Sequence, residues 1–356
     1  MGLSYNRYYH PMTMEYWKQT IGYKKYLDGI RRQKMPDVTP EKLKYVAALF
    51  DIELSSLYTI ANHPDLFYET YYVPKRNGGE RRIDSPDETL KCIQKWVLTD
   101  ILYQIPCSKY AKAYVPKMSV KENAKFHRNQ KVVLTIDVKD FFSSISENLV
   151  FNIFHDSCSY ETSVAVLLTK LCTYNGALPQ GAPTSAYLSN LVMREFDEAV
   201  GEYCQSKNIR FTRYADDMTF SGDFDIAGLL CFVDQELAHV GLKRHPEKLK
   251  VMRQHNRQIT TGIVVNSSRQ VPREYRMKIR QEVYYIKKYG LDSHVAHIGE
   301  EKSRYLQSLW GRINYVLCIN PNDAQMLECR KYIEALNTLE SLELEKMRIL
   351  QFLDEH

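Results

Sequence analysis

Residues 210–221 read Arg-Phe-Thr-Arg-Tyr-Ala-Asp-Asp-Met-Thr-Phe-Ser, and this stretch decides the fold of the chain. Two runs of β-prone residues flank the central Ala-Asp-Asp, which predicts a β-hairpin over 209–222 with Asp216 and Asp217 at its tip. Adjacent carboxylates at a tight turn repel each other unless a cation lies between them. A solvated turn is the ordinary alternative, because aspartate is a common turn residue.

A third carboxylate follows a strongly apolar strand upstream. Residues 131–136 read Lys-Val-Val-Leu-Thr-Ile, which predicts a buried strand that ends at Asp137. A carboxylate at the end of a central strand is costly unless it is paired or bound to a metal. Asp137, Asp216 and Asp217 together offer oxygen ligands for two Mg²⁺ ions, with Mn²⁺ as the alternative metal. Such an ion pair would activate a sugar hydroxyl and stabilise a leaving pyrophosphate.

The rest of the chain alternates helices and strands without a regular βαβ order, which predicts α+β layers. We expect mostly helices over residues 1–68, with one from Thr39-Pro40-Glu41 to Phe50, and a second hairpin over 70–86. The further predicted helices are 88–105, 145–174, 183–200 and 225–240, with short strands near 249–252 and 260–265 and an almost wholly helical region after Pro272.

Composition permits a nucleic-acid partner without demanding one, since the net charge is only +5. Residues 1–34 hold seven Lys and Arg, whereas residues 323–356 hold eight acids against four bases, so the two ends should do different jobs. The eight cysteines form no CxxC pair, which argues against a zinc site or a redox motif. Free thiols, and the lack of an 18-residue apolar run, predict a soluble cytoplasmic protein that does not bind membranes.

Three segments, in order, resemble the motifs of reverse transcriptases. The Asp137 segment resembles polymerase motif A, residues 178–185 (Leu-Pro-Gln-Gly-Ala-Pro-Thr-Ser) resemble motif B, and Tyr-Ala-Asp-Asp at 214–217 resembles motif C. The match runs from about Tyr71 to Pro321. It implies an RNA-directed DNA polymerase of right-hand shape: fingers and palm with an antiparallel sheet and packed helices, followed by a helical thumb.

The resemblance also divides the chain into expected domains. These are an N-terminal helical extension over 1–68, fingers over 69–130 with the helices of 145–180, a palm with motifs A to E over 131–265, a thumb over 266–321 and an acidic C-terminal helix over 322–356. Nothing beyond the expected thumb has the length of a second enzymatic domain. We therefore expect neither a retroviral nor a group II intron enzyme.

Residue roles carry over only where the motifs match. Asp137 and Asp216 would be the main metal ligands, with Asp217 weaker and the backbone carbonyl of Val138 as a further ligand. Lys248 resembles the motif D lysine, a proton donor to pyrophosphate. The expected nucleotide-binding set is Lys75, Arg76, Arg81, Phe142, Gln180 and Gly181.

Within that set, Phe142 would be the steric gate that selects dNTPs, with a core aromatic as the alternative. Gln180 and Gly181 would lie along the nucleotide. Lys75, Arg76 and Arg81 would grip the triphosphate, with Arg82 as a competitor to Arg81. The alternative for this basic hairpin is a solvated cationic turn.

Two further segments resemble bacterial retron reverse transcriptases. Asn123-Ala-Lys-Phe-His127 resembles their Asn-Ala-x-x-His signature, and Thr260-Thr261-Gly262 resembles their Val-Thr-Gly with a conservative change at its first residue. We therefore expect Asn123, His127 and Gly262 at the primer or RNA, although an isolated histidine is more often structural.

Retron enzymes copy a structured noncoding RNA and prime from the 2′-hydroxyl of a guanosine, which gives a branched RNA–DNA product called msDNA. They act in bacterial anti-phage defence, commonly with an effector protein. The resemblance thus implies four partners: a cognate noncoding RNA, its DNA product, dNTPs and an effector.

A helix predicted from Pro272 to Tyr289 would hold RNA through one basic face, formed by Arg273, Arg276, Arg280 and Lys287. Tyr275, Ile279 and Ile286 would form its packed side. A solvated face is the alternative. For the acidic stretch after Asp323, a protein contact or a capping helix fits better than RNA.

Other functions stay open at this point. A diversity-generating or abortive-infection reverse transcriptase is the enzymatic alternative, and a catalytically silent RNA-binding scaffold is the alternative of another class. An unrelated metal-dependent nuclease would leave Gln180 and Phe142 unexplained.

Overall fold

The computed structural model describes residues 40–75 and 78–338, so the basic residues 1–34 and the acidic end beyond 338 lie outside the described part. The chain forms two compact units. Unit 1 comprises Met1–Val115, Val138–Val200 and Cys231–Arg244, and unit 2 comprises Pro116–Asp137, Gly201–Leu230 and His245–His356. Each of the expected fingers and palm domains thus contributes to both units.

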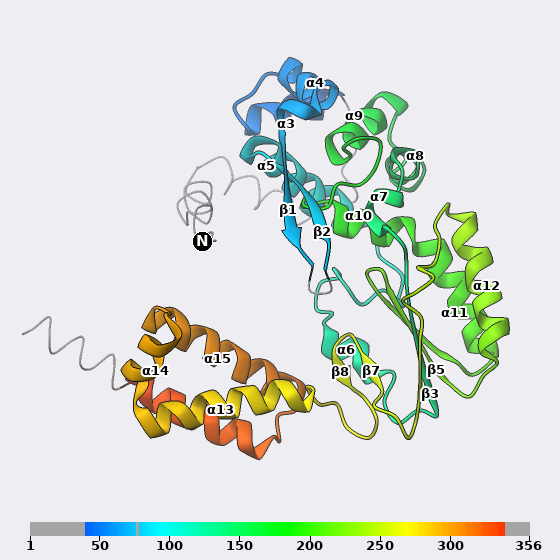
Figure 1. The fold of residues 1–356 in the computed structure, drawn as a ribbon. Helices are drawn as coiled ribbons and strands as arrows, with labels where there is room; N and C mark the ends of the chain where they lie inside the picture. Colours follow the sequence, from blue (N-terminus) through cyan, green and yellow to red (C-terminus); the bar gives the residue numbers. More distant parts are fainter. Residues whose placement is uncertain (1–39, 76–77, 339–356) are drawn as a thin grey trace, which may run out of the picture. The chain divides into compact units, whose positions relative to one another are not determined.

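Unit 1 is built from helices around one hairpin (Figure 1). The hairpin pairs β1 (Tyr68–Pro74) with β2 (Glu80–Pro86), as predicted over 70–86. Its helical segments are α3 (Pro40–Leu49), α4 (Leu54–Asn62), η1 (Pro64–Leu66), α5 (Glu88–Trp96), η2 (Val97–Ile101), η3 (Leu102–Gln104), α7 (Phe141–Ser144), α8 (Glu147–Asn152), η4 (Ile153–Ser157), α9 (Thr162–Cys172) and α10 (Ser185–Val192). A buried amide joins two of these helices to the hairpin, because Gln94 Nε2 on α5 donates at 2.8 Å both to Tyr68 Oη on β1 and to the carbonyl of Leu171 on α9.

Unit 2 contains a four-stranded antiparallel sheet in the order β4-β5-β3-β6. Its strands are β3 (Val132–Asp137), β4 (Arg210–Tyr214), β5 (Asp217–Gly222) and β6 (Lys250–Arg253). The predicted buried strand is confirmed: β3 lies between two neighbours, and five of its six residues are buried. The hairpin predicted over 209–222 is β4 and β5. Both faces of its strands are buried, one with apolar residues such as Phe211 and Phe220 and the other with polar residues such as Thr212 and Ser221.

Two long helices, α11 (Arg194–Ser206) and α12 (Ile226–His239), each run from one unit into the other. Unit 2 also holds the short helix α6 (Val120–Lys125) and a small hairpin of β7 (Ile259–Thr260) and β8 (Ile263–Val264). Thr261 and Gly262 form its two-residue turn with φ of 46° and 81°, which is the left-handed geometry that favours glycine.

The C-terminal part of unit 2 is helical, as predicted. Its helices are α13 (Arg273–Tyr289), α14 (Leu291–Ile298) and α15 (Lys302–Ile319), followed by a helical segment over 324–338; we call these four the helical bundle (Figure 1). Their buried side chains, among them Ile279, Leu309 and Met326, form one apolar core with Val133 and Ile263. No helix in the described part of the chain has the length and apolar character that a membrane crossing requires.

The predicted helices differ from the observed ones mainly where the chain turns. The stretch 88–105 winds as an α-helix, then a π-turn, then a 3₁₀-turn, and 145–174 breaks at Ser159, which has a positive φ of 55°. The helix expected after Pro183 begins at Ser185 and is interrupted at Met193. Periodicity predicted these helices but not their interruptions, because both sides of a break continue the same apolar pattern.

Candidate active site

The strand register brings two of the predicted carboxylates together. Asp137, the last residue of β3, is the direct antiparallel partner of Asp217, the first residue of β5. Directly opposed residues on antiparallel strands point to the same face, with Cβ atoms roughly 5 Å apart. The two-residue turn that joins β4 to β5 consists of Ala215 and Asp216, so Asp216 directly precedes Asp217. The sheet therefore gathers all three acids at one end.

A buried arginine stabilises the turn that carries Asp216. Ala215 takes a left-handed conformation with φ of 58°, and its carbonyl accepts a hydrogen bond of 3.0 Å from Arg213 Nη1. Arg213 is completely buried in β4. Sequence reasoning assigned no role to Arg213, because its place beside the Ala-Asp-Asp turn gave no sign that the side chain is buried.

Lys248 completes this group of charges. Its Nζ donates to Oδ1 of Asp137 at 2.9 Å and to Oδ2 at 3.0 Å. The backbone N–H of His245 donates to the Asp137 carbonyl at 2.7 Å, which anchors the segment that carries the lysine beside β3. Burial by itself would lower the pKa of Lys248, but Asp137 and then the other two aspartates raise it, so the lysine stays an ammonium.

Burial and negatively charged neighbours both act on Asp217. Its side chain keeps some access to solvent, yet the protein packed around it, followed by the charges of Asp216 and Asp137, raises the pKa of Asp217 to about 6. Lys248 and Lys250 oppose that rise. Three carboxylates that destabilise one another's charged forms in this way would be stabilised by divalent cations.

The donor set fits hard divalent metal ions, because every ligand it offers is an oxygen. In the part of the chain that the structure describes, no three His, Cys, Asp or Glu side chains form a ready-made metal cluster. At Asp137, the Lys248 ammonium engages both carboxylate oxygens. That ammonium stands where a metal cation would bind, so a bound metal would displace it.

Val138, the expected carbonyl ligand, directly follows Asp137 and opens the unit 1 segment that holds Phe142. It is buried and forms an antiparallel bridge with Arg244. Two residues on, Asp140 turns the chain with a φ of 47° into α7. Within α7, Phe141 is buried whereas Phe142 is half-buried, with the ring centroids 5.4 Å apart. Phe141 therefore fills the core, which leaves Phe142 for the predicted gate.

The motif B residues contact the fingers hairpin. The carbonyl of Gln180 accepts a 3.0 Å hydrogen bond from the backbone N–H of Asp84 on β2. Gly181 has a φ of 147°, and a Cβ at this position would lie 2.5 Å from the Asp84 carbonyl oxygen. Gly181 thus approaches the β2 backbone closely, while the approach to a nucleotide predicted for it stays a prediction. Asp84, which the sequence interpretation missed, also accepts from Thr70 Oγ1 at 2.6 Å.

The basic side chains of the hairpin separate into two groups. Arg82 Nε pairs with Asp84 Oδ1 at 2.9 Å, and its guanidinium lies over the Tyr174 ring. Arg81 is exposed on the opposite face of the strand, and Lys75 begins the turn, with its N–H bonded to the Gly79 carbonyl at 2.9 Å. Arg76 lies outside the described residues. The ion pair of Arg82 favours Arg81 as the triphosphate ligand.

Asn123 and His127 lie in the interior of unit 2, and this corrects the RNA contact predicted for them. The His127 ring is fully buried between two strands, with Nδ1 2.8 Å from Ser221 Oγ and Nε2 2.7 Å from Thr212 Oγ1. Burial, and then the charge of Arg210, lowers the pKa of His127 to about 3. Asn123, equally buried, donates through Nδ2 to Thr261 Oγ1 at 3.3 Å, in the turn that contains Gly262.

These contacts give the two signature residues a structural role: His127 joins β4 to β5, and Asn123 supports the β7–β8 turn. The alternation of polar residues on β4 and β5 was the available signal, since Thr212 and Ser221 point inward where apolar residues are usual.

The basic face of α13 is largely matched by protein. Arg276 Nη1 pairs with Asp323 Oδ2 at 3.1 Å, Arg280 Nη1 donates to Gln325 Oε1 at 2.6 Å, and Lys287 Nζ pairs with Glu328 Oε1 at 3.0 Å. The segment beginning at Asp323 thus binds three of the four side chains predicted to hold RNA, and Arg273 remains exposed. These contacts lie within the chain and involve the described part of the acidic stretch, and a contact of that stretch with another protein stays a prediction.

Comparison with known proteins agrees with the motifs. The profile of the family described as "Reverse transcriptase (RNA-dependent DNA polymerase)" matches residues 73–284. Retron Ec86 reverse transcriptase of Escherichia coli is 30% identical over 279 residues, which cover 77% of this chain and 86% of that protein. Retron Mx65 reverse transcriptase of Myxococcus xanthus is 31% identical over 286 residues (74% and 64%). Retron Ec83 reverse transcriptase of E. coli is 28% identical over 305 residues (80% and 91%).

A solved structure of telomerase from Candida albicans gives a TM-score of 0.44 at 10% identity over 75% of this chain and 63% of that one, which is a distant similarity. The family profile covers more than half of the chain, and the identity to the Ec86 enzyme extends over most of both proteins. This chain therefore belongs to the reverse transcriptase (RNA-dependent DNA polymerase) family and, within it, to the retron reverse transcriptases.

Proposed function

We propose that this chain reverse transcribes a cognate structured noncoding RNA into branched RNA–DNA, or msDNA, and that it acts in anti-phage defence together with an effector protein. Family membership supports an RNA template. The strand register supports the chemistry: Asp137 faces Asp217 across two strands, Asp216 lies in the adjoining turn, and Lys248 bonds the strand-end carboxylate. This arrangement is the single observation that carries the proposal.

Asp137, Asp216 and Asp217, with the carbonyl of Val138, would hold two Mg²⁺ ions, with Mn²⁺ as an alternative. When bound, these ions supply the activation of the primer hydroxyl and the stabilisation of pyrophosphate. Lys248, displaced from Asp137, would hold its proton on Nζ and donate it to the leaving pyrophosphate. A protonated lysine suits that role because its pKa is raised in this group of acids.

The nucleotide-binding roles are proposed for unit 1. Arg81 and Lys75 would bind the triphosphate, since Arg82 is already paired with Asp84. Gln180, whose backbone is tied to β2, would align its side chain with the incoming nucleotide. Phe142, the half-buried ring of its pair, would exclude a ribose 2′-hydroxyl. These four residues would bind and select dNTPs.

DNA synthesis on a poly(rA)·oligo(dT) template with Mg²⁺ tests the site. Asp216→Asn should reduce synthesis by more than about 100-fold, which is the upper range for losing even an indirect metal partner. Asp223→Asn is a matched control, because Asp223 is an exposed acid next to the opposite end of β5, paired with Lys131 at 2.6 Å. Equal activity in Asp216→Asn and the wild type would refute the assigned centre, and inactivity of the wild type would favour a silent scaffold.

Sequencing the nucleic acid that copurifies with the full chain tests the retron assignment. We expect one RNA species joined to DNA through a 2′–5′ linkage that a debranching enzyme removes. Recovery of only random cellular RNA without covalently attached DNA would contradict this assignment while leaving the polymerase centre intact.

A further inference from the structure

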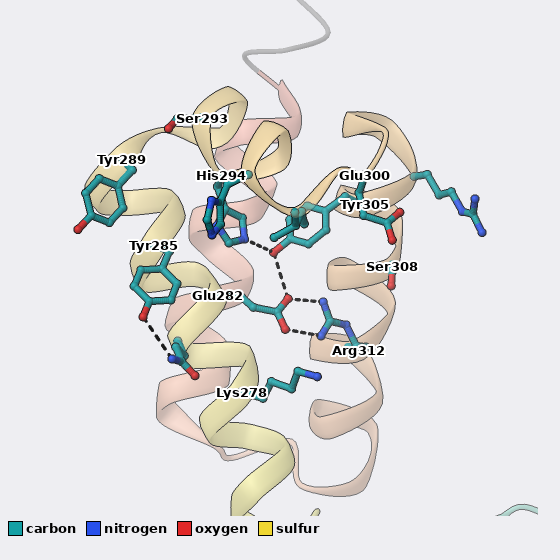
Figure 2. Close-up of a pocket in the computed structure, with 14 residues that line it drawn as sticks. Lys278, Glu282, Tyr285, Tyr289, Ser293, His294, Glu300, Tyr305, Ser308 and Arg312 are labelled. Carbon is teal, nitrogen blue, oxygen red and sulfur yellow. Dashed lines mark hydrogen bonds and ion pairs between the residues drawn. The ribbon is translucent and has the colours of Figure 1, made fainter. Parts of the chain in front are cut away.

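The helical bundle contains a cavity of about 930 Å³ to which the roles above assign nothing (Figure 2). Residues of α13, α14 and α15 line it, and Glu300 lies on the loop between the last two. Pockets that hold small organic molecules range from roughly 300 to 1,000 Å³, so a nucleotide fits within this volume. The lining mixes tyrosines, histidines and charged groups, which disfavours a lipid or another purely apolar ligand.

Aromatic rings form a continuous row along this cavity. From Tyr289 to Tyr285 the centroids lie 6.2 Å apart, from Tyr285 to His294 6.1 Å, and from His294 to Tyr305 5.4 Å. The exposed end of the row is Tyr289, which is 56% exposed, followed by Tyr285, which is 37% exposed. Rings this close leave no room for a base between them, so a base would stack on their open faces.

A hydrogen-bonded network makes the buried end of the row rigid. Tyr305 Oη lies 3.0 Å from His294 Nε2 and donates to Glu282 Oε2 at 3.0 Å (Figure 2). Both carboxylate oxygens of Glu282 accept from Arg312, one of them at 2.8 Å from Nη1. Burial tends to raise the pKa of Glu282, but the bonds and charge of Arg312 lower it below its ordinary value, so the pair stays ionised. The platform is thus fixed before any ligand arrives.

Basic side chains lie both in the cavity lining and beside the open end of the row. The lining includes three cations (Lys278, Arg304 and Arg312) and two carboxylates (Glu282 and Glu300), and Glu282 is already matched by Arg312. Lys288 adds a cation beside the row, with its Nζ 5.0 Å from the centre of the Tyr289 ring. Lys288 is thus beside the open end, whereas Lys278 and Arg304 line other parts of the cavity, where the phosphates on either side of a stacked base would meet them.

The two faces of α13 differ in what covers them. The face predicted to bind RNA is bonded to Asp323, Gln325 and Glu328, whereas the Tyr285–Tyr289 side opens to the cavity. Aromatic faces with adjacent cations are the usual means of holding single-stranded nucleic acid. Paired bases in a duplex keep their faces stacked on each other and cannot reach the rings.

We propose that this cavity binds an unpaired base of RNA, stacked on Tyr285 and Tyr289, with its flanking phosphates held by Lys278, Lys288 and Arg304. The inference rests on the proposed function for the identity of that RNA, since a structured noncoding RNA presents unpaired bases in its loops. The site would therefore distinguish loops from stems.

The test uses the full chain, without dNTPs, and an oligoadenylate strand that contains one 2-aminopurine, a base whose fluorescence is quenched when it stacks. The wild type should quench the probe and bind it more tightly than an RNA duplex of equal length. Tyr285→Ala combined with Tyr289→Ala should weaken single-strand binding roughly 5- to 150-fold, the effect of losing aromatic stacking, and should abolish quenching. The single variant Tyr285→Phe keeps the ring and should therefore retain both the binding and the quenching of the wild type.

Tyr275→Ala is the matched control, because Tyr275 is 38% exposed on the same helix, does not line the cavity and packs against Tyr315. Quenching that survives in the double variant, or that is lost equally in Tyr275→Ala, overturns the inference. Thermal melting of each variant separates loss of the site from loss of the fold. DNA synthesis and probe quenching are separate readouts. Failure of the proposed function would appear as absence of DNA synthesis, whereas the Asp216→Asn variant should still quench the probe.

Discussion

Gly181→Ala should destabilise unit 1 by disrupting the contact between the motif B segment and β2. The new methyl group would lie 2.5 Å from the Asp84 carbonyl oxygen, 3.0 Å from its carbon and 3.2 Å from Ile83 Cγ2. The first two atoms are backbone and cannot rotate away. Relief requires a shift of β2 or of the motif B segment, which would weaken the 3.0 Å bond between Asp84 N–H and the Gln180 carbonyl.

Three contributions set the expected size. Overpacking against backbone costs about 1–3 kcal/mol, a non-glycine residue at a φ of 147° costs a further 1–3 kcal/mol or so, and the weakened hydrogen bond costs about 1 kcal/mol. The total of about 3–7 kcal/mol is a large share of the roughly 5–15 kcal/mol that stabilises a folded protein. We also expect a higher KM for dNTPs, because Gln180 would move with the segment.

Urea unfolding followed by circular dichroism measures this loss, and Gly176→Ala is its control. Gly176 has a φ of 76° with nothing within 4 Å of its added Cβ, so its substitution reports backbone strain without the clash. Gly181→Ala should be less stable than Gly176→Ala by about 2 kcal/mol or more. Equal stability of the two variants would show that β2 and the motif B segment do not press on each other.

Three further outcomes follow from the site. Lys248→Met should slow single-nucleotide incorporation by about 100-fold, because the proton donor to pyrophosphate is lost. An unchanged incorporation rate would exclude it as the proton donor. Phe142→Ala should raise incorporation of rNTPs relative to dNTPs and cost less stability than Phe141→Ala, for which about 3–5 kcal/mol is expected; unchanged selectivity would exclude Phe142 as the gate. His127 keeps its neutral form in the fold down to a pH of about 3 but is protonated below 6.5 when unfolded. The unfolded state therefore takes up more protons, and the free energy of unfolding should fall by about 1.4 kcal/mol per pH unit below 6.5. Urea unfolding at pH 7.5 and 5.5 should show a smaller drop for His127→Gln than for the wild type, and an equal drop would contradict the buried neutral ring.

Local pattern predicted the elements that carry the catalytic acids. The apolar run before Asp137 and the β-prone residues on either side of Asp216 each lie within one segment, so periodicity and turn chemistry were enough. The order of the motifs then placed the acids in one family. Their direct strand pairing depends on register, which is set by packing across the sheet and needs the structure.

Contacts between residues that are far apart in the sequence could not be predicted from it. Lys248 and Asp137 are 111 positions apart, and His127 lies 94 positions from Ser221. A histidine in a signature looks the same whether it faces RNA or the core, because the motif carries no information about burial. Helical spacing likewise placed Arg276 on a basic face but could not show that Asp323, 47 positions later, covers it.

The segment beginning at Asp323 has a consequence for how this protein responds to ionic strength. A protein–nucleic acid affinity falls with salt in proportion to the number of phosphates that its cations neutralise, because each one frees condensed counterions. Arg276, Arg280 and Lys287 already face oxygens of their own chain. A phosphate would bind these side chains only by displacing their partners within the chain. The number of basic residues along α13 therefore overstates the number of phosphates that this helix neutralises. The chain thus supplies internal partners for these cations, which favours recognition by shape and stacking over indiscriminate attraction.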